Sequence, residues 1–538
     1  MKSSKKILWI GLASVALAAC NDLDTEIYGD YITTEQKQQV VDDDPDKLLF
    51  SVTGITGNFY LYGQLYSVAD GAHFDFGFPA VNLQMDARGM DLVSTAVGYN
   101  HFSAQAQMRD ASPTGYLSNM GYSYPYKQIY AANTLLATLG DTSDDPTQMF
   151  YIAQARALRA YDYFMLAQLF QFTYKGHEDM PCVPLITEKN SDQVALDGGT
   201  PRAKVSEIYA QIHADLDAAI DYLANCGVTP SSTGLSKSKR LVSLAVAYGM
   251  RARVNLVMNR WAEAEADATM AISNFAGAPT SITQAARPFG ASLDETNVMW
   301  GIATAESDRV VTSGIVNWPS FMCAFSDGGY ISVNPITISK TLYAMIADSD
   351  VRKGWWINDS KESANLTADE AAWMAEIDYP AFTSVKFAPY QGIIGNSTCA
   401  QDIPLMRIEE MHLIKAEAKA MGGNAAGGLQ DLITFVNEYR DPSYPSTAIS
   451  ATPQDVQDAV WIQRRIELWG EGMSYFDIMR LKKGIDRRGG GWPANWTYVI
   501  DPESNILRLP LPNSEIQANK FISEADNNPS SPTPTPVQ

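Results

Sequence analysis

WIQRRIELWGEGMSYFDIMRLKKG, residues 461–484, is the segment from which the architecture of this chain is best inferred. Its apolar residues recur in steps of four, three, four and three, which predicts one face of a helix. These residues are Ile462, Ile466, Trp469, Met473 and Phe476. Gly470 and Gly472 weaken a helix, so we expect a kink or a close backbone approach near Trp469.

A second face of the same predicted helix carries charges. Arg464, Glu467 and Glu471 lie three and four residues apart and would be neighbours on its surface. Two adjacent carboxylates repel unless cations lie among them, so we expect Arg464 and a partner from elsewhere in the fold to compensate them. Asp477 and Arg480 can pair one turn later. We interpret the segment as a packing and charge-network element rather than a catalytic one.

The stretch QRRIELWGEGMSYFDIMR, residues 463–480, resembles the signature ERRxELxxEGxRxxDLxR of the SusD/RagB family of nutrient-binding lipoproteins. The matching residues are Arg464, Arg465, Glu467, Leu468, Glu471, Gly472, Asp477 and Arg480. The stretch departs from the signature at Gln463, where the family usually has an acid, and at Ser474, where a basic residue is common. Further family-like segments follow the family order along nearly the whole chain, at residues 124–139, 153–171 and 508–522.

The N-terminus reads as a secretion signal. Residues 1–20 combine three lysines with an apolar core at 7–19 that is too short to span a bilayer. Leu17-Ala18-Ala19-Cys20 resembles the bacterial lipobox, which implies that Cys20 becomes the lipid-bearing N-terminus of the mature chain. An ordinary signal peptide with a chance cysteine is the alternative. The acids that follow Cys20 resemble surface-export signals of Bacteroidetes lipoproteins, so we expect a lipid-anchored outer-membrane protein that faces the cell exterior.

Composition excludes several classes of function. The 538 residues carry a formal net charge of −21, which argues against binding nucleic acid or anionic lipid through a basic patch. The chain has no phosphate-binding glycine loop, GxSxG or HExxH, and its five histidines fall in no recognised ligand spacing. Cys182, Cys226, Cys323 and Cys399 show no CxxC spacing, and either two disulfides or buried free thiols fit the sequence.

Helix pairs dominate the rest of the chain. Residues 241–272 predict two helices separated near Asn259, with alanines at tetratricopeptide-like positions. Further helices are expected at 48–66, 206–223, 404–420 and 427–440, and a short strand at Val298–Thr304. The predicted fold class is therefore mainly α, a tetratricopeptide-like repeat scaffold with a long loop-rich insertion and a few short strands. We expect a signal peptide at 1–20, a tether at 21–47, helical parts at 48–274 and 401–525, a ligand-binding insertion at 275–400 and a disordered tail at 526–538.

Two segments rich in glycine and aromatic residues, 70–115 and 310–335, read as loops outside the repeats. Long irregular loops are more often functional than idle, and sugar rings stack on aromatic side chains while polar groups bind their hydroxyls. The family resemblance implies a shallow surface site of this kind. The candidate stacking residues are Trp318, Phe321, Tyr330, Tyr99 and Phe76, with His101 as a partner for a hydroxyl group.

The resemblance implies a non-enzymatic protein that captures a glycan and delivers it to a SusC-like TonB-dependent outer-membrane transporter. A peptide ligand, as in the RagB branch, is the first alternative. A surface glycoside hydrolase that uses Glu467 and Glu471 as its acid and base is a second, and a pure assembly scaffold is a third. We expect no cofactor, although the acidic run Asp42–Asp44 offers oxygen ligands for a structural calcium ion.

Overall fold

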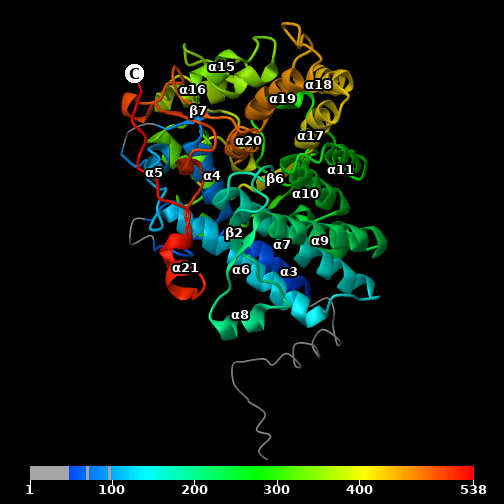
Figure 1. Ribbon diagram of the computed structural model, residues 1–538. Coiled ribbons are helices and arrows are strands. Elements are labelled where there is room, and N and C mark those ends of the chain that lie inside the picture. Colours follow the sequence, from blue (N-terminus) through cyan, green and yellow to red (C-terminus); the bar gives the residue numbers. More distant parts are fainter. Residues whose placement is uncertain (1–47, 68–71, 95–97, 538) are drawn as a thin grey trace, which may run out of the picture. The chain divides into compact units, whose positions relative to one another are not determined.

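Paired helices stack against one another through the part of the chain that the structure, a computed structural model, describes: residues 48–67, 72–94 and 98–537 (Figure 1). The main helices are α6 (Tyr116–Leu139), α7 (Pro146–Phe170), α9 (Val205–Asn225), α10 (Leu244–Val257), α11 (Trp261–Ser273), α17 (Ile408–Met421), α18 (Ala425–Tyr439) and α19 (Pro453–Glu467). Each packs on the next in the order α6, α7, α9, α10, α11, α17, and α17 also packs on α18 and α19. This arrangement confirms the predicted mainly α, tetratricopeptide-like scaffold.

The helix boundaries follow from local chemistry. Asp145 accepts a hydrogen bond from the backbone of Gln148, and Pro146 begins α7, as is typical of a helix N-terminus. The predicted break between α10 and α11 falls at Asn259, whose φ of 58° lies in the left-handed region that asparagine tolerates. The buried alanines of α11 then allow both α10 and α17 to pack closely against α11.

Four antiparallel two-stranded pairs connect distant parts of the chain. They are β1 (Leu92–Val93) with β5 (Thr337–Ile338), β2 (Pro181–Pro184) with β3 (Arg202–Lys204), β4 (Val298–Ile302) with β6 (Ile403–Arg407), and β7 (Ile485–Asp486) with β8 (Val499–Ile500). In the longest pair Val298 lies opposite Arg407 and Ile302 opposite Ile403. This pair joins the first part of the predicted insertion 275–400 to the strand that follows it and leads into α17.

The segment 275–400 is built of short elements around a core of its own. Its helices are α12 (Ile282–Ala285), α13 (Arg309–Thr312), α14 (Trp318–Met322), α15 (Lys340–Ala344) and α16 (Ala368–Ile377). Phe325, Ile331, Ile357, Met374 and Val385 form one buried cluster within it. Adjacent Trp355 and Trp356 are both buried, at 1% and 0% exposure.

The remaining helices are shorter. The α-helices are α3 (Leu48–Gly57), α4 (Phe78–Arg88), α5 (Ser103–Ala106), α8 (Ser191–Asp197), α20 (Ser474–Arg480) and α21 (Asn513–Ala518). The 3₁₀-helices are η3 (Pro230–Thr233), η4 (Ser238–Arg240), η5 (Tyr330–Ser332), η6 (Val351–Trp355), η7 (Tyr390–Gly392), η8 (Ala494–Trp496), η9 (Asn505–Leu507) and η10 (Glu524–Asp526).

Residues 461–484 do not form one helix, which corrects the expectation of a single continuous face. Helix α19 ends at Glu467 and α20 begins at Ser474. Between them Gly470 and Gly472 have φ values of 76° and 78°, a backbone conformation that favours glycine. A Cβ atom on Gly472 would lie 2.5 Å from Cβ of Asn82, so the segment makes the close backbone approach that the glycines predicted.

The expectation of a loop over 70–115 was wrong for its centre. Residues 78–88 form α4, which is buried at every position except Asn82. A helix buried on all sides has no polar face, so its sequence lacks the apolar periodicity that predicts a surface helix. The helix predicted over 48–66 is also shorter than expected and ends at Gly57.

The two ends of the chain differ in what can be described. The predicted signal peptide, Cys20, the tether 21–47 and the acidic run Asp42–Asp44 lie outside the described residues. At the C-terminus, where composition predicts disorder, the backbone of Ser531 donates to Ala111 and that of Val537 to Thr497. Within the described residues no helix is both long enough and apolar enough to cross a bilayer. Cys182, Cys226, Cys323 and Cys399 are buried free thiols, which resolves the alternative left open by the sequence.

Candidate functional site

A buried group of paired charges, here called the signature network, surrounds the end of α19. Its members are Asp350, Arg352, Lys386, Arg407, Glu409, Arg440, Glu467 and Glu471. Glu467 is fully buried, and its two carboxylate oxygens accept hydrogen bonds from Arg352, Arg407 and Arg440 at 2.8–3.1 Å. The sequence predicted compensation by Arg464 and by a partner from elsewhere in the fold. The three arginines do come from outside residues 461–484, whereas Arg464 donates to Asp477 instead.

Glu467 and Glu471, the acid and base pair of the glycoside hydrolase alternative, are both held in the ionised form. Burial opposes the charge of Glu471, but Arg407 and Lys386 outweigh it and lower the pKa of that carboxyl. The guanidinium of Arg440, foremost among its neighbours, lowers the pKa of Glu467 well below its ordinary value, against the effect of burial. Glycoside hydrolysis needs one carboxyl that keeps its proton near neutral pH, and this pair does not provide it.

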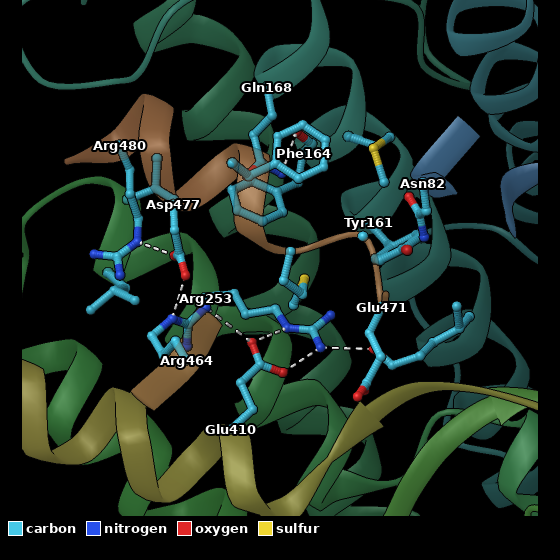
Figure 2. A pocket seen from close by; sticks show the side chains of 17 residues that line it. Asn82, Tyr161, Phe164, Gln168, Arg253, Glu410, Arg464, Glu471, Asp477 and Arg480 are labelled. Carbon is cyan, nitrogen blue, oxygen red and sulfur yellow. Dashed lines mark hydrogen bonds and ion pairs between the residues drawn. The ribbon is translucent and has the colours of Figure 1, made fainter. Parts of the chain in front are cut away.

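A small cavity of about 60 Å³ lies between α7, α10 and the segment that contains α20 (Figure 2). Figure 2 shows Arg464 between Asp477 and Glu410, at 2.7 Å and 3.9 Å. Arg253 donates to Glu410, and Arg480 donates to Asp477 from the other side. The volume suits only a few water molecules, and the charges face each other in matched pairs. We interpret this cavity as a joint between the repeats and the C-terminal segment.

The structure brings four of the six predicted ligand-binding residues into direct contact. The Phe321 ring stacks on Phe76 at 5.6 Å and on Tyr330 at 4.7 Å between ring centres. His101 contacts Tyr330 edge-on at 4.8 Å. Residues about 250 positions apart in the sequence therefore meet at one place. We call this group the aromatic cluster; it consists of Phe76, His101, Phe321 and Tyr330 and of two further residues, His73 and Phe102, described below.

Exposure separates the members of this group. Phe76, Phe321 and Tyr330 are buried, at 0%, 1% and 5% exposure, so their rings support the site from within. Tyr99 is 68% exposed and has a φ of 65°, which is unusual for a bulky residue. Trp318 begins α14, is 5% exposed, and packs edge-on against Phe387 rather than against the cluster.

Two further members of the aromatic cluster were not singled out from the sequence. His73 stacks on His101 at 5.0 Å between ring centres, and its Nδ1 hydrogen-bonds to the Tyr330 hydroxyl. Phe102 packs on Phe321 at 4.7 Å. Neither lies at a spacing that marks a binding residue, and only their position within residues 70–115 could have suggested them.

Burial favours the neutral forms of His101 and Tyr330 in the cluster. Burial, and secondarily the neighbouring His73, lowers the pKa of His101 to about 4. Burial, and secondarily Tyr99, raises the pKa of Tyr330 to about 12. His101 Nε2 has no hydrogen-bond partner within the part of the chain that the structure describes. The cluster thus combines uncharged donors and acceptors with one exposed ring, a combination suited to a neutral polyhydroxylated ligand. Those described residues contain no group of three or more side chains placed to bind a metal ion.

Comparison with known proteins points to one family. Residues 80–256 match a family described as starch-binding and associating with the outer membrane, and residues 360–529 match the SusD family. A SusD-like carbohydrate-binding protein from Bacteroides vulgatus is 19% identical, with a TM-score of 0.70 and coverage of 92% of this chain and 98% of its own. A SusD superfamily protein from Bacteroides thetaiotaomicron is also 19% identical, with a TM-score of 0.70 and coverage of 90% and 99%.

A third solved structure, a laminarin-binding SusD-like protein, is 19% identical, with a TM-score of 0.62 and coverage of 90% of this chain and 99% of its own. No curated protein matches the sequence. At this level of identity the likeness of the structures concerns the fold.

Proposed function

Because this chain belongs to the SusD/RagB family, we propose that it is a cell-surface lipoprotein that binds an oligosaccharide or polysaccharide without altering it. In this proposal the bound glycan passes to a SusC-like TonB-dependent outer-membrane transporter. The family description as starch-binding and associating with the outer membrane supports both the ligand class and the location. Lipid on Cys20 would supply the membrane anchor.

The observation that carries the proposal is the exposed ring of Tyr99, which lies two residues before His101 in the chain and is close enough to the buried aromatic cluster to raise the pKa of Tyr330. A ring that is 68% exposed gains from covering by the apolar face of a sugar. The buried rings of Phe76 and Phe321 would hold the surface in place beneath it. Trp318 lies in α14 with Phe321 but packs on Phe387, so the proposal gives it no stacking contact with the ligand.

The neutral polar groups of the cluster would bind the sugar hydroxyls. His101 lacks a partner for Nε2 among the described residues, and leaving such a group unpaired costs free energy that a ligand hydroxyl would offset. The Tyr330 hydroxyl, fixed by His73, offers a second hydrogen-bonding group. Since the predicted pair Glu467 and Glu471 is locked in ion pairs, the proposal assigns no chemistry on the ligand to this protein.

The test is a binding screen with the soluble form that lacks residues 1–20. Affinity gels and isothermal titration with a glycan panel, starch and laminarin among its members, are expected to identify a ligand. Tyr99→Ala should then weaken binding about tenfold without lowering the unfolding midpoint. Tyr130→Ala is the matched control, because Tyr130 is a 73% exposed tyrosine on α6.

Each alternative gives a different result in the same screen. Binding of peptides in place of glycans would replace the ligand class with that of the RagB branch. Release of reducing ends from a polysaccharide, lost in Glu471→Gln, would make the protein a hydrolase. Full affinity of Tyr99→Ala for a bound glycan would remove Tyr99 from the site.

A further inference from the structure

A second cavity, remote in sequence from the aromatic cluster, lies between the β2–β3 hairpin and residues 508–528. Its volume is about 450 Å³, in the range of small-molecule sites. Two guanidiniums, those of Arg202 and Arg508, line it. We call this the two-arginine cavity.

Neither arginine has a carboxylate partner within the described residues. Arg202 donates to the carbonyls of Pro181, Cys182 and Asp526 and to the amide oxygen of Asn528. Arg508 donates only to the amide oxygens of Gln171 and Asn505. In so acidic a protein two cations without an ion pair at one cavity need an explanation, because an uncompensated buried charge is costly.

Arg487 shows what a purely structural arginine looks like in this fold. It is 1% exposed, and each of its five N–H groups donates to a backbone carbonyl. Arg508 is similarly buried, at 8% exposure, but it makes two hydrogen bonds, both to side-chain amide oxygens, and its Nε has no partner in the described part of the chain. Its hydrogen-bonding capacity is therefore largely unused beside the cavity.

The electrostatics agree with a missing anion. Burial lowers the pKa of Arg508, and the positive charge of Arg202 lowers it further. Asp526 also lines the cavity; its carboxylate accepts from the backbone and hydroxyl of Ser523 and makes no ion pair with either arginine, although its charge partly offsets the effect of burial on the pKa of Arg202. An oxyanion in the cavity would relieve the repulsion between the guanidiniums and take up their unused donors.

The rest of the lining combines the polar residues Asp526, Asn527 and Asn528 with apolar side chains, two of which are partly exposed. Phe521 is 47% exposed and Met180 is 38% exposed, and Ile522 completes this side. An inorganic anion would leave these side chains in water, whereas an organic acid could cover them. Charge at one side and apolar surface at the other match a sugar acid, with its carboxylate on the arginines and its ring against Phe521.

We propose that the two-arginine cavity is a binding site for a small oxyanion-bearing ligand, with a uronic acid as the organic form that fits it best. The site is separate from the proposed glycan site, so its occupancy does not depend on Tyr99. A glycan that contains both a neutral and an acidic sugar could bind through its neutral sugar at the proposed glycan site or through its acidic sugar at the two-arginine cavity.

The experiment titrates the soluble chain with glucuronate, glucose, sulfate and phosphate at constant ionic strength, by calorimetry and by thermal unfolding. Glucuronate is expected to bind and glucose is not. Arg508→Gln and Arg202→Gln should each weaken glucuronate binding about tenfold or more. Arg109→Gln, at an exposed arginine, is the charge-matched control and should leave binding unchanged.

Further variants separate the sources of the anion and protect the test against misfolding. Phe521→Ala, at an exposed position, should weaken the binding of glucuronate but not that of sulfate. If this change weakens neither, and sulfate binds as tightly as glucuronate, the site is assigned to inorganic oxyanions. If Arg508→Gln fails to fold, Arg202→Gln carries the test alone, because Arg202 is only partly buried. Glucuronate binding that survives in Tyr99→Ala keeps this site distinct from the glycan site. Absence of binding by all three anions, or full affinity in both arginine variants, would overturn the proposal.

Discussion

In the signature network both carboxylate oxygens of Glu467 accept from guanidiniums, whereas in the aromatic cluster His101 Nε2 has no partner among the described residues. Both regions are largely buried, and both join distant segments: Arg352 and Glu467 are 115 positions apart in the network, and His73 and Tyr330 are 257 positions apart in the cluster. The network matches its charges within the protein and so has nothing left for a ligand. The cluster keeps unused hydrogen-bonding capacity next to an exposed ring, which is what a binding surface needs.

This difference separates two meanings of a buried polar group. In the network, burial makes each charged side chain strongly dependent on its ion-pair partner, since an unpaired charge there would cost free energy. In the cluster, burial favours the neutral form of His101. We assign the first region to the frame and propose the second for recognition, and the changes below test parts of this interpretation.

The largest effect is expected from Glu467→Gln. This change removes the negative charge that three guanidiniums share, so the free energy of unfolding should fall by about 3–5 kcal/mol. Chemical denaturation measures it. Glu265→Gln, which affects a surface pair with Lys419, is the control and should cost less than about 1 kcal/mol. Similar small losses in both variants would mean that the network contributes little to the frame.

Phe321→Ala is expected to come next. The ring is 1% exposed and contacts Phe76, Phe102 and Tyr330, so its loss leaves a cavity and should cost about 3 kcal/mol. Thermal unfolding measures the loss, with Phe50→Ala, at a 78% exposed position, as the control. If Phe321→Ala reduced glycan affinity without changing stability, this ring would belong to the contact surface and not to its support.

Asp86→Asn tests the contact between α4 and the segment that follows α19, and its effect depends on pH. Burial raises the pKa of Asp86 to about 7, so the folded chain binds a proton that the unfolded chain releases above about pH 4. The stability contributed by this group is present in full at low pH and is lost as pH rises through 7. The asparagine variant should therefore be more stable than the parent by on the order of 1–3 kcal/mol at pH 8, and by much less at pH 4.

Denaturation at the two pH values measures this difference. Asparagine can still accept the hydrogen bond that the Gly472 backbone donates to Asp86. Asp359→Asn, at an exposed position, is the control and should show no such pH dependence. Equal differences at pH 4 and pH 8 would place Asp86 in an ordinary solvated environment.

The smallest effect is expected from reductant. The four described cysteines are free, and burial raises the pKa of Cys182 and of Cys399 to about 12. A thiol reagent should label none of them before unfolding, and reductant should leave Tm unchanged in the form that lacks residues 1–20. A lower Tm under reducing conditions would reveal a disulfide between two of these residues.

Much of the frame could be predicted from the sequence, because paired surface helices leave periodic patterns. Alanines at fixed spacing marked the close packing of α10 and α11, and Asn259 marked the break between them. The glycines at 470 and 472 indicated a disturbance, but not that the helix ends there, because a kink and a break share the same sequence signal. Helix α4 escaped prediction because it has no solvent-facing side.

The binding region could be predicted only in outline. The candidate residues were chosen from two segments, and the structure does place Phe76, His101, Phe321 and Tyr330 together. Their exposure could not be predicted, since the sequence does not distinguish a ring that packs on other rings from a solvent-exposed ring that could contact a ligand. Among the six candidate residues, only Tyr99 is largely exposed to solvent, and its role as a stacking residue stays a prediction.

Helix α4 depends on partners that lie near the other end of the chain. The carboxylate of Asp91, just beyond α4, accepts from Arg465 and Ser474, positions 374 and 383 residues later, and Asp86 accepts from Gly472. During synthesis the first fifth of the protein must therefore wait for almost the last tenth before its buried polar groups are satisfied. For an exported chain, this delay means that folding is completed only after nearly all of it has crossed the inner membrane, and premature termination anywhere before residue 474 should yield a product open to proteolysis.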